Sequence, residues 1–190
     1  MCIRDSPLTD VFQVQDEVTG KIVGSLAGRL YQAEIARALL KHPDSLDAYD
    51  LVLRAVEMQL RFTPADNSKA RELLQKAIAL DPNYAGAYSV LAWNYLHEFR
   101  YYHPARPQES YQKALDLASK AVALDPSLGW GRGALGETLL WGRRHHQALA
   151  QFEEGRKANP NDADLLTLSA DAYVYMGRPK EAINLVKQAM

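Results

Sequence analysis

Histidines are the residues of this sequence whose type and spacing come nearest to a metal site. His145 and His146 are adjacent in GRRHHQAL, and adjacent residues of an α-helix point about 100° apart. A shared ion is therefore not expected, and we interpret this pair as solvated histidines of a basic turn. His97 and His103 lie on either side of a predicted helix end, but no third ligand accompanies them. We predict no metal site.

Signatures of catalysis are missing as well. The sequence holds no glycine-rich phosphate loop, no Gly-x-Ser-x-Gly and no His-Glu-x-x-His. Its single cysteine, Cys2, excludes an intrachain disulfide and a thiolate-based metal site, and it fits a reducing, cytoplasmic location. We therefore predict that this chain is not an enzyme and has neither a catalytic residue nor a cofactor.

Composition excludes further classes. The 190 residues are 47% hydrophobic and 24% charged, as in ordinary globular proteins. The net charge is −1 with both signs interspersed, so no nucleic-acid surface is expected. The apolar runs are shorter than the roughly 18 to 20 residues that span a bilayer, and no signal peptide is present. Residues 1–6, MCIRDS, resemble a translated sequencing-adapter remnant, and we expect a non-native leader there.

Prolines preceded by Asp or Asn punctuate the chain and predict its helices. Pro82 lies in ALDPNY, Pro126 in ALDPSL and Pro160 in KANPNDA. The last two are 34 residues apart, and the first two are 44 apart, which is 34 plus ten. Proline disfavours the α conformation at the residue before it, so each helix should end there. The next helix should begin at an N-cap residue, namely Asn83, Ser127 or Asn161. Such a period predicts stacked helix-turn-helix units.

Small and aromatic residues recur at fixed positions of these units. The second unit supplies Leu91, Ala92, Tyr95, Ala114 and Ala121, and the fourth supplies Ala170, Tyr173, Gly177, Ala182 and Ala189. The third unit departs by Gly155 where alanine is usual, and the first matches most loosely. Over residues 44–190 the chain resembles the tetratricopeptide repeat. The resemblance implies an all-α fold, a right-handed α-solenoid of about four repeats preceded by a long amphipathic helix. The units are expected at 44–82, 83–126, 127–160 and 161–190, the last one truncated.

The helical spacing supports the same interpretation independently. Ala92 and Gly136 should lie where the two helices of a unit approach closely, and Leu91, Tyr95 and Leu135 form a buried stripe. A unit has one thin apolar face, so neighbours must stack to bury it. Turns inside units are also signalled. Thr63 should cap a helix that opens with Pro64, and Gly177 should end one before Pro179 begins the next.

An insertion of ten residues falls in the second unit. It lies in HEFRYYHPARPQES, where Pro104 and Pro107 forbid a continuous helix, so we expect a surface loop at about 100–107. Two interpretations stay open. The loop presents Tyr101, Tyr102 and His103 to a partner, or it is a lengthened helix end followed by a tolerated connection.

The N-terminal segment, residues 7–43, does not match the repeat. A long amphipathic helix is predicted to begin near residue 10, because apolar residues step by three or four from Val11 to Leu30. Gly20, Gly24 and Gly28 form a second face on its opposite side. This glycine face either approaches another helix or domain closely, which makes it a candidate for self-association, or belongs to a simple connecting helix.

A second resemblance concerns the chain as a whole. PLTDVFQVQDEV, SLDAYDLVLRA and ARELLQKAIALDPNYAGAYSVLAW resemble the stretch that enters the repeat tail of long bacterial regulatory proteins. In those proteins a class III adenylate or guanylate cyclase domain, or sometimes a winged-helix DNA-binding domain, precedes the tail. The resemblance implies a protein-interaction tail of a signalling protein, with a tail of a winged-helix transcriptional regulator or a stand-alone adaptor as alternatives. No catalytic residue of a cyclase is carried over to this chain.

The repeat resemblance also implies which side chains face the concave groove of the array. The candidate partner-binding residues are Trp93, His97, Trp130, Glu137, Trp141, Asp171 and Tyr175, and the same positions include Ser89, Leu96, Leu140, Asp164, Thr167 and Val174. Aromatic anchors with carboxylates suit an unidentified protein or peptide partner that has apolar and basic side chains. The Lys, Arg and Asn residues of carboxylate-clamp members are missing. The alternative is that these aromatics are core residues, with Trp130 and Trp141 better groove candidates than Trp93.

The sequence ends in EAINLVKQAM, inside the predicted last helix. Ile183 and Val186 are expected to meet a fifth unit in an intact array. Without that unit their apolar side chains should stay exposed, which predicts self-association or fraying of this helix.

Overall fold

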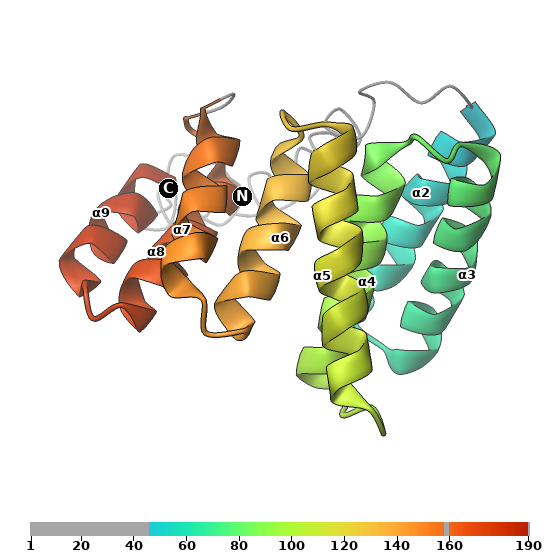
Figure 1. Ribbon diagram of the computed structural model, residues 1–190, viewed down its shortest axis with the longest axis horizontal. Helices are drawn as coiled ribbons and strands as arrows, with labels where there is room; N and C mark the ends of the chain where they lie inside the picture. Colours follow the sequence, from blue (N-terminus) through green and yellow to red (C-terminus); the bar gives the residue numbers. More distant parts are fainter. Residues whose placement is uncertain (1–45, 158–159, 190) are drawn as a thin grey trace, which may run out of the picture. The chain divides into compact units, whose positions relative to one another are not determined.

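The computed structural model describes residues 46–157 and 160–189, and within these ranges the chain forms helices and no strand (Figure 1). The helices are α2 (Leu46–Gln59), α3 (Pro64–Leu80), α4 (Ala85–Tyr101), α5 (Pro107–Leu124), α6 (Gly129–Trp141), α7 (His145–Arg156), α8 (Ala163–Tyr175) and α9 (Pro179–Ala189). No helix of the described part is long and apolar enough to cross a membrane. The predicted leader 1–6 and the predicted N-terminal helix with its glycine face lie outside the described residues.

Consecutive helices pair into four hairpins that stack in chain order. α2 packs on α3, α4 on α5, α6 on α7 and α8 on α9, and each hairpin contacts the next (Figure 1). The first helices also form a row of their own, because α4 contacts both α2 and α6, and α6 contacts α8. The described part is therefore an all-α solenoid, as the repeat spacing predicts. Its first helices are the elements that can bring residues of different units together.

Small residues allow this close packing. Ala92 of α4, Ala118 of α5 and Ala134 of α6 are completely buried in one cluster. Gly136 faces Phe152 of α7 so closely that a Cβ atom on the glycine would overlap the phenyl ring. The predicted close approaches at Ala92 and Gly136 are confirmed, and an alanine at residue 136 would require the buried Phe152 ring to shift.

The starts of the helices differ from the prediction. α4 and α6 begin at Ala85 and Gly129, two residues after Asn83 and Ser127, and their N-cap positions lack a side-chain cap. The reason is a turn formed by the preceding aspartate. The Asp81 carboxylate accepts from the backbone N of Asn83 at 3.0 Å, and Asp125 accepts in the same way from Ser127. The N-cap predictions at these sites are therefore wrong, since the aspartate takes the hydrogen-bonding role.

The prediction at the third site is wrong by one residue. α8 is capped by Asp162 rather than by Asn161, and the Asp162 side chain accepts from the backbone N of Leu165. The cap predicted at Thr63 is confirmed, because its hydroxyl accepts from the backbone N of Asp66 while Pro64 opens α3. A side-chain acceptor at the N-cap satisfies one of the free N–H groups of a helix start.

The turn inside each described hairpin holds one residue in the left-handed region. These residues are Phe62, His103, Arg143 and Gly177, with φ of 51°, 46°, 60° and 72°. The prediction that Gly177 ends a helix before Pro179 is confirmed. The other three turns use residues with side chains, for which this conformation is strained. A glycine in the sequence therefore marks only the last of these four left-handed turn positions.

The ten additional residues of the second unit mostly lengthen its helices. α4 and α5 have 17 and 18 residues, whereas α6 and α7 have 13 and 12. Tyr101 is helical, and the connection runs from Tyr102 to Arg106 before Pro107 opens α5. This arrangement matches the interpretation of a lengthened helix end followed by a connection, and it extends α4 by about one turn beyond His97.

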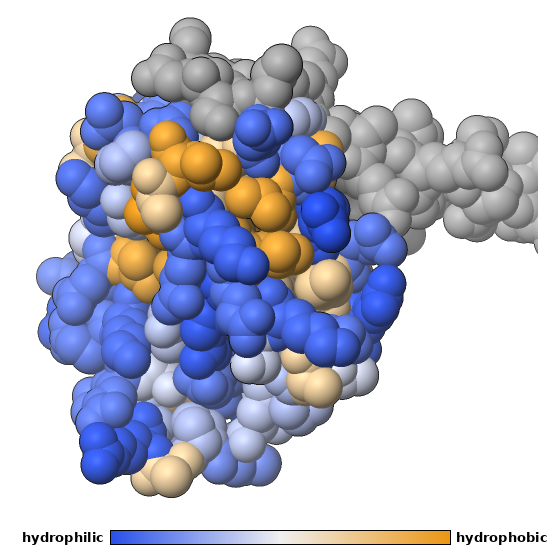
Figure 2. All heavy atoms as spheres, turned by 90° about the vertical axis from the view of Figure 1, so that its right-hand side faces the viewer, coloured by the Kyte–Doolittle hydropathy of each residue, from blue (hydrophilic) through white to orange (hydrophobic). Residues whose placement is uncertain are grey.

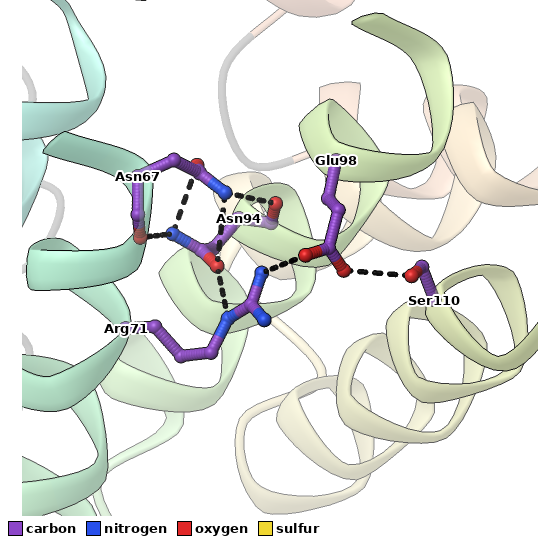
Figure 3. A network of polar contacts seen from close by, with 5 residues as sticks. All are labelled: Asn67, Arg71, Asn94, Glu98 and Ser110. Carbon is purple, nitrogen blue, oxygen red and sulfur yellow. Dashed lines mark hydrogen bonds and ion pairs between the residues drawn. The ribbon is translucent and has the colours of Figure 1, made fainter. Parts of the chain in front are cut away.

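A polar network of Asn67, Arg71, Asn94, Glu98 and Ser110 joins the first two hairpins (Figure 3). Asn94 Nδ2 donates to the backbone O and the Oδ1 of Asn67, at 2.8 and 3.0 Å. Arg71 Nε donates to Asn94 Oδ1 at 2.8 Å, and its Nη2 lies 3.0 Å from Glu98 Oε1. Ser110 Oγ donates to the other Glu98 oxygen at 2.7 Å. The network fixes α4 between α3 and α5.

Candidate partner-binding surface

The seven predicted groove residues lie on three first helices. Trp93 and His97 are on α4, Trp130, Glu137 and Trp141 on α6, and Asp171 and Tyr175 on α8. Because the first helices stand in one row, residues that are far apart in the sequence become neighbours. Contacts connect the residues of α4 to those of α6, and electrostatic interactions extend to α8.

Aromatic rings form a continuous strip across the first units. The strip consists of Phe62, Trp93, His97, Tyr101 and Trp130. The His97 ring is 5.3 Å from Phe62, 6.0 Å from Trp93 and 5.9 Å from Tyr101. Trp93 meets Trp130 edge to face at 6.5 Å, and Phe62 meets Tyr101 in the same way at 6.3 Å. Trp93 and Trp130 are partly buried, while Phe62 and Tyr101 are about half exposed, at 56% and 47%.

His97 is a neutral member of this strip. Burial lowers its pKa to about 4, and the charge of Arg100 acts in the same direction. Its Nδ1 and the Nε1 of Trp93 are buried and have no hydrogen-bond partner within the described residues. An imidazole with this pKa is uncharged near neutral pH, so the strip behaves there as an apolar surface with two unused polar atoms.

A second group, the arginine–acid cluster of Arg100, Glu137 and Trp141, adjoins the strip. Arg100 Nη1 lies 2.5 Å from Glu137 Oε1, and Trp141 Nε1 donates to the same oxygen at 3.1 Å. The Arg100 guanidinium is 4.4 Å from the centre of the Trp141 ring and 4.9 Å from that of Tyr101. Arg100 therefore connects the strip on α4 with α6 through a charge pair and two cation–π contacts.

Burial governs the electrostatics of the two carboxylates. It raises the pKa of Glu137 above its ordinary value; Arg100 and the hydrogen bond from Trp141 oppose this shift, and the charge of Asp171 adds to it. Loss of water also raises the pKa of Asp171, although that residue is exposed, and Arg100 again opposes the shift. Glu137 and Asp171 are thus close enough to influence each other while sharing one guanidinium.

The last residues of three first helices are exposed aromatics. α4 ends at Tyr101, α6 at Trp141 and α8 at Tyr175, and Trp141 and Tyr175 are 40% and 60% exposed. Tyr175 stacks on His145 of α7, with ring centres 5.6 Å apart. The prediction that His145 is a solvated turn residue is therefore wrong, because the ring of Tyr175 covers it, whereas His146 is exposed.

Comparisons with known proteins agree with this architecture. No family model matches the chain. The solved structure of TTC0263, a thermophilic TPR protein of Thermus thermophilus, has a TM-score of 0.68 and 21% identity over 92% of this chain and 89% of that one. A crystal structure of MamA has a TM-score of 0.54 and 23% identity over 77% and 78% of the two chains. The chain has the tetratricopeptide-repeat (TPR) fold.

One curated relative is also similar in sequence. The Rhizobium meliloti (strain 1021) protein named "Putative adenylate cyclase 3" is 31% identical over 144 residues, which are 76% of this chain. The match covers 24% of that protein. The TPR chain therefore spans about a quarter of the length of the relative that it matches.

Several positions that the TPR resemblance assigns to the groove are not at the surface. Ser89 and Leu96 of α4 and Leu140 of α6 are buried, at 0%, 0% and 4% exposed. Glu137 is also only 3% exposed, so it lies beneath the surface rather than on it. As direct contacts these positions are wrong, because the packing of the TPR array buries them. Asp164, Thr167 and Val174 are exposed on α8.

Two residues of the surface were missed by sequence reasoning. Phe62 lies in the α2–α3 turn, and its positive φ, which nothing in the sequence signals, is part of the turn that holds its ring against His97 and Tyr101. Arg100 lies three residues after His97, in the extra turn that the insertion adds to α4. The length of the insertion was the available signal. No group of three metal-ligating side chains occurs in the part of the TPR array that the structure describes.

Proposed function

We propose that this chain is a protein-interaction scaffold whose partner binds across α4, α6 and α8. The supporting observation is that aromatic residues of four successive hairpins, Phe62, Tyr101, Trp141 and Tyr175, are all 40% or more exposed. Large aromatic side chains are costly to leave in water and are the typical anchors of protein interfaces. The unit boundaries expected from the sequence, at 82, 126 and 160, are part of this proposal.

We further propose that the chain is the TPR tail of a larger bacterial signalling protein, an adenylate or guanylate cyclase. Support comes from the similarity to the Rhizobium meliloti protein, whose name is that of a cyclase. In this proposal catalysis belongs to another domain of the parent protein. The tail acts in the cytoplasm, where binding of a partner to the tail regulates that catalytic domain. The full coding sequence of the parent tests this part, since a winged-helix domain in place of a cyclase would contradict it.

Self-association is a second way in which the scaffold could act. Ile183 and Val186 of α9 are 54% and 41% exposed, and α9 carries an apolar stripe along one side. Apolar side chains are also exposed at the α2–α3 end of the array (Figure 2). In this hairpin Leu60 and Leu80 are 41% and 54% exposed. Sedimentation of the chain with Ile183→Ser and Val186→Ser tests the α9 route, because these changes should shift a concentration-dependent oligomer to monomer.

Binding of displayed peptides tests the scaffold itself. The chain is used to select from a library of randomised peptides, and selected peptides are measured against Tyr175→Ala and Leu80→Ala variants. Both positions are exposed and apolar, but only Tyr175 belongs to the proposed surface. The proposal expects weaker binding for Tyr175→Ala alone. Equal losses for both variants, or no selected peptide, would contradict it.

A further inference from the structure

Charged side chains from three first helices lie near Trp141. Glu137 and Asp171 contribute two carboxylates from α6 and α8, and Arg100 contributes one guanidinium, which is paired with Glu137. Asp171 takes part in no ion pair of the described ranges 46–157 and 160–189. The exposed carboxylate therefore stands beside an ion pair without a cation of its own.

The buried ion pair is itself incompletely bonded. Glu137 accepts both of its hydrogen bonds on Oε1, from Arg100 and from Trp141. Its Oε2 and the Nε of Arg100 are buried and lack a partner within the described residues. A carboxylate that is 97% buried with one oxygen unsatisfied is costly, so the cluster would gain from a further donor. The exposed indole of Trp141 donates to the other oxygen of the same carboxylate, Oε1.

The ring of Trp141 already stacks against one cation. The Arg100 guanidinium lies 4.4 Å from its centre, and 40% of the tryptophan surface is still exposed. Indole is the best aromatic acceptor of cation–π contacts. On α8, Val174 and Tyr175 are 57% and 60% exposed, so an apolar surface lies on the same helix as Asp171.

We infer that Trp141, Asp171 and Tyr175 form a subsite for a lysine or arginine side chain of the protein partner. Trp141 stacks on the cationic group, Asp171 is its counter-ion, and Tyr175 contacts the aliphatic stem of the side chain. The inference rests on the proposed scaffold function and adds the chemistry of the residue that the partner inserts. An acidic partner residue would meet the exposed carboxylate of Asp171 there and would be repelled.

Two variants that each remove one negative charge distinguish this subsite from a general effect of charge on binding. Asp171→Asn removes the proposed counter-ion while it keeps the shape of the side chain. Glu153→Gln removes one negative charge from an exposed position of the second helix α7 and serves as the matched control. Trp141→Leu keeps an apolar side chain but removes the ring, whereas Trp141→Phe keeps a weaker ring and should restore part of the affinity.

Short randomised peptides with one fixed central residue, either arginine, lysine, citrulline or glutamate, test the inference by fluorescence polarisation on the intact chain. Citrulline has the shape of arginine without its charge. We expect arginine and lysine peptides to bind about threefold to tenfold more tightly than citrulline peptides. This preference should disappear in Asp171→Asn and persist in Glu153→Gln.

Each of the other possible results contradicts either the cationic subsite alone or the subsite together with the scaffold function. If peptides bind but citrulline equals arginine, or if Asp171→Asn keeps the preference, the cationic subsite is wrong while the scaffold function stands. If glutamate peptides bind best, the sign of the subsite is wrong. If no peptide of any kind binds, both the subsite and the proposed scaffold function fail.

Discussion

Two groups of this chain each pair an arginine with a carboxylate, but they differ in whether all of their buried polar atoms have a hydrogen-bond partner. In the polar network, Glu98 uses one oxygen for Arg71 and the other for Ser110, and none of the buried side-chain atoms of its five residues lacks a partner (Figure 3). In the arginine–acid cluster, Glu137 Oε2 and Arg100 Nε have none within the described residues. The first group has nothing left to offer a ligand, whereas the second does.

The surroundings of the two groups point the same way. The polar network lies between α3, α4 and α5 (Figure 3). These are the two helices of one hairpin and the second helix of the hairpin before it, and no buried polar side-chain atom of the network lacks a partner. The arginine–acid cluster lies in the row of first helices and adjoins the exposed rings of Tyr101 and Trp141. Saturated polar groups specify how units stack, and unsaturated ones beside exposed aromatics are typical of a binding surface. We therefore propose that the polar network stabilises the stacking of the units and that the arginine–acid cluster takes part in recognition.

The largest expected effect belongs to the saturated network. Asn94→Ala removes a completely buried side chain that bonds Asn67 and accepts from Arg71. We expect the free energy of unfolding to fall by about 3 to 5 kcal/mol, because several buried polar groups lose their partner. Urea unfolding followed by circular dichroism measures it. A loss below about 1 kcal/mol would show that the network does not hold the units together.

An intermediate effect is expected for His97, which lies in the strip. Its pKa is about 4 in the folded chain and 6.5 ordinarily, so the unfolded chain binds a proton that the folded chain does not. The contribution of the neutral His97 to stability is therefore fully present above about pH 6.5. It is lost as the pH falls from there towards 4, and the free energy of unfolding decreases by on the order of 2 to 3 kcal/mol. His97→Phe should remove this part of the pH dependence. Identical pH profiles of unfolding for the two chains would contradict the burial of a neutral imidazole.

The smallest effect on stability is expected for Asp171. Asp171→Asn changes an exposed side chain without an ion pair, so the free energy of unfolding should move by no more than about 0.5 kcal/mol. Binding should respond instead. The pKa of Asp171 is raised, so peptide affinity should fall as the pH is lowered through that value, and the Asn variant should lack this dependence. A pH-independent affinity of the wild type would break the distinction between the two groups.

Local signals predicted much of the fold, and long-range contacts account for what they missed. The period of prolines, the Thr63 cap and the small residue Gly136 act within a helix or between adjacent helices, so the sequence shows them directly. The polar network was not predicted, because Asn67 and Asn94 are 27 residues apart and asparagine has no helical pattern that signals a buried position. The starts of α4 and α6 were misplaced because the Asp81 and Asp125 carboxylates accept hydrogen bonds from the backbone N of Asn83 and Ser127, so these two residues lie in a turn before the helix.

The sequence predicted which residue types form the candidate surface better than it predicted which of them are buried or exposed. Repeat positions correctly brought Trp93, Trp130 and Trp141 onto one row of helices, since a first helix follows each of the Asp-Pro breaks at Pro82 and Pro126. They could not separate buried Glu137 from exposed Asp171, because the packing of the neighbouring first helix decides exposure. Arg100 entered the site through the lengthening of α4, which the repeat pattern does not contain.

The most direct test of the proposed binding surface is the Trp141→Ala variant, with peptide affinity and the free energy of unfolding measured on the same sample. We predict that affinity for a selected peptide falls about tenfold or more, as for an aromatic anchor, while the free energy of unfolding falls by less than about 2 kcal/mol. The ring is 40% exposed, so its removal leaves no closed cavity in the core. A loss of several kcal/mol with unchanged affinity would show that Trp141 holds the array together, and the binding surface would lose its centre.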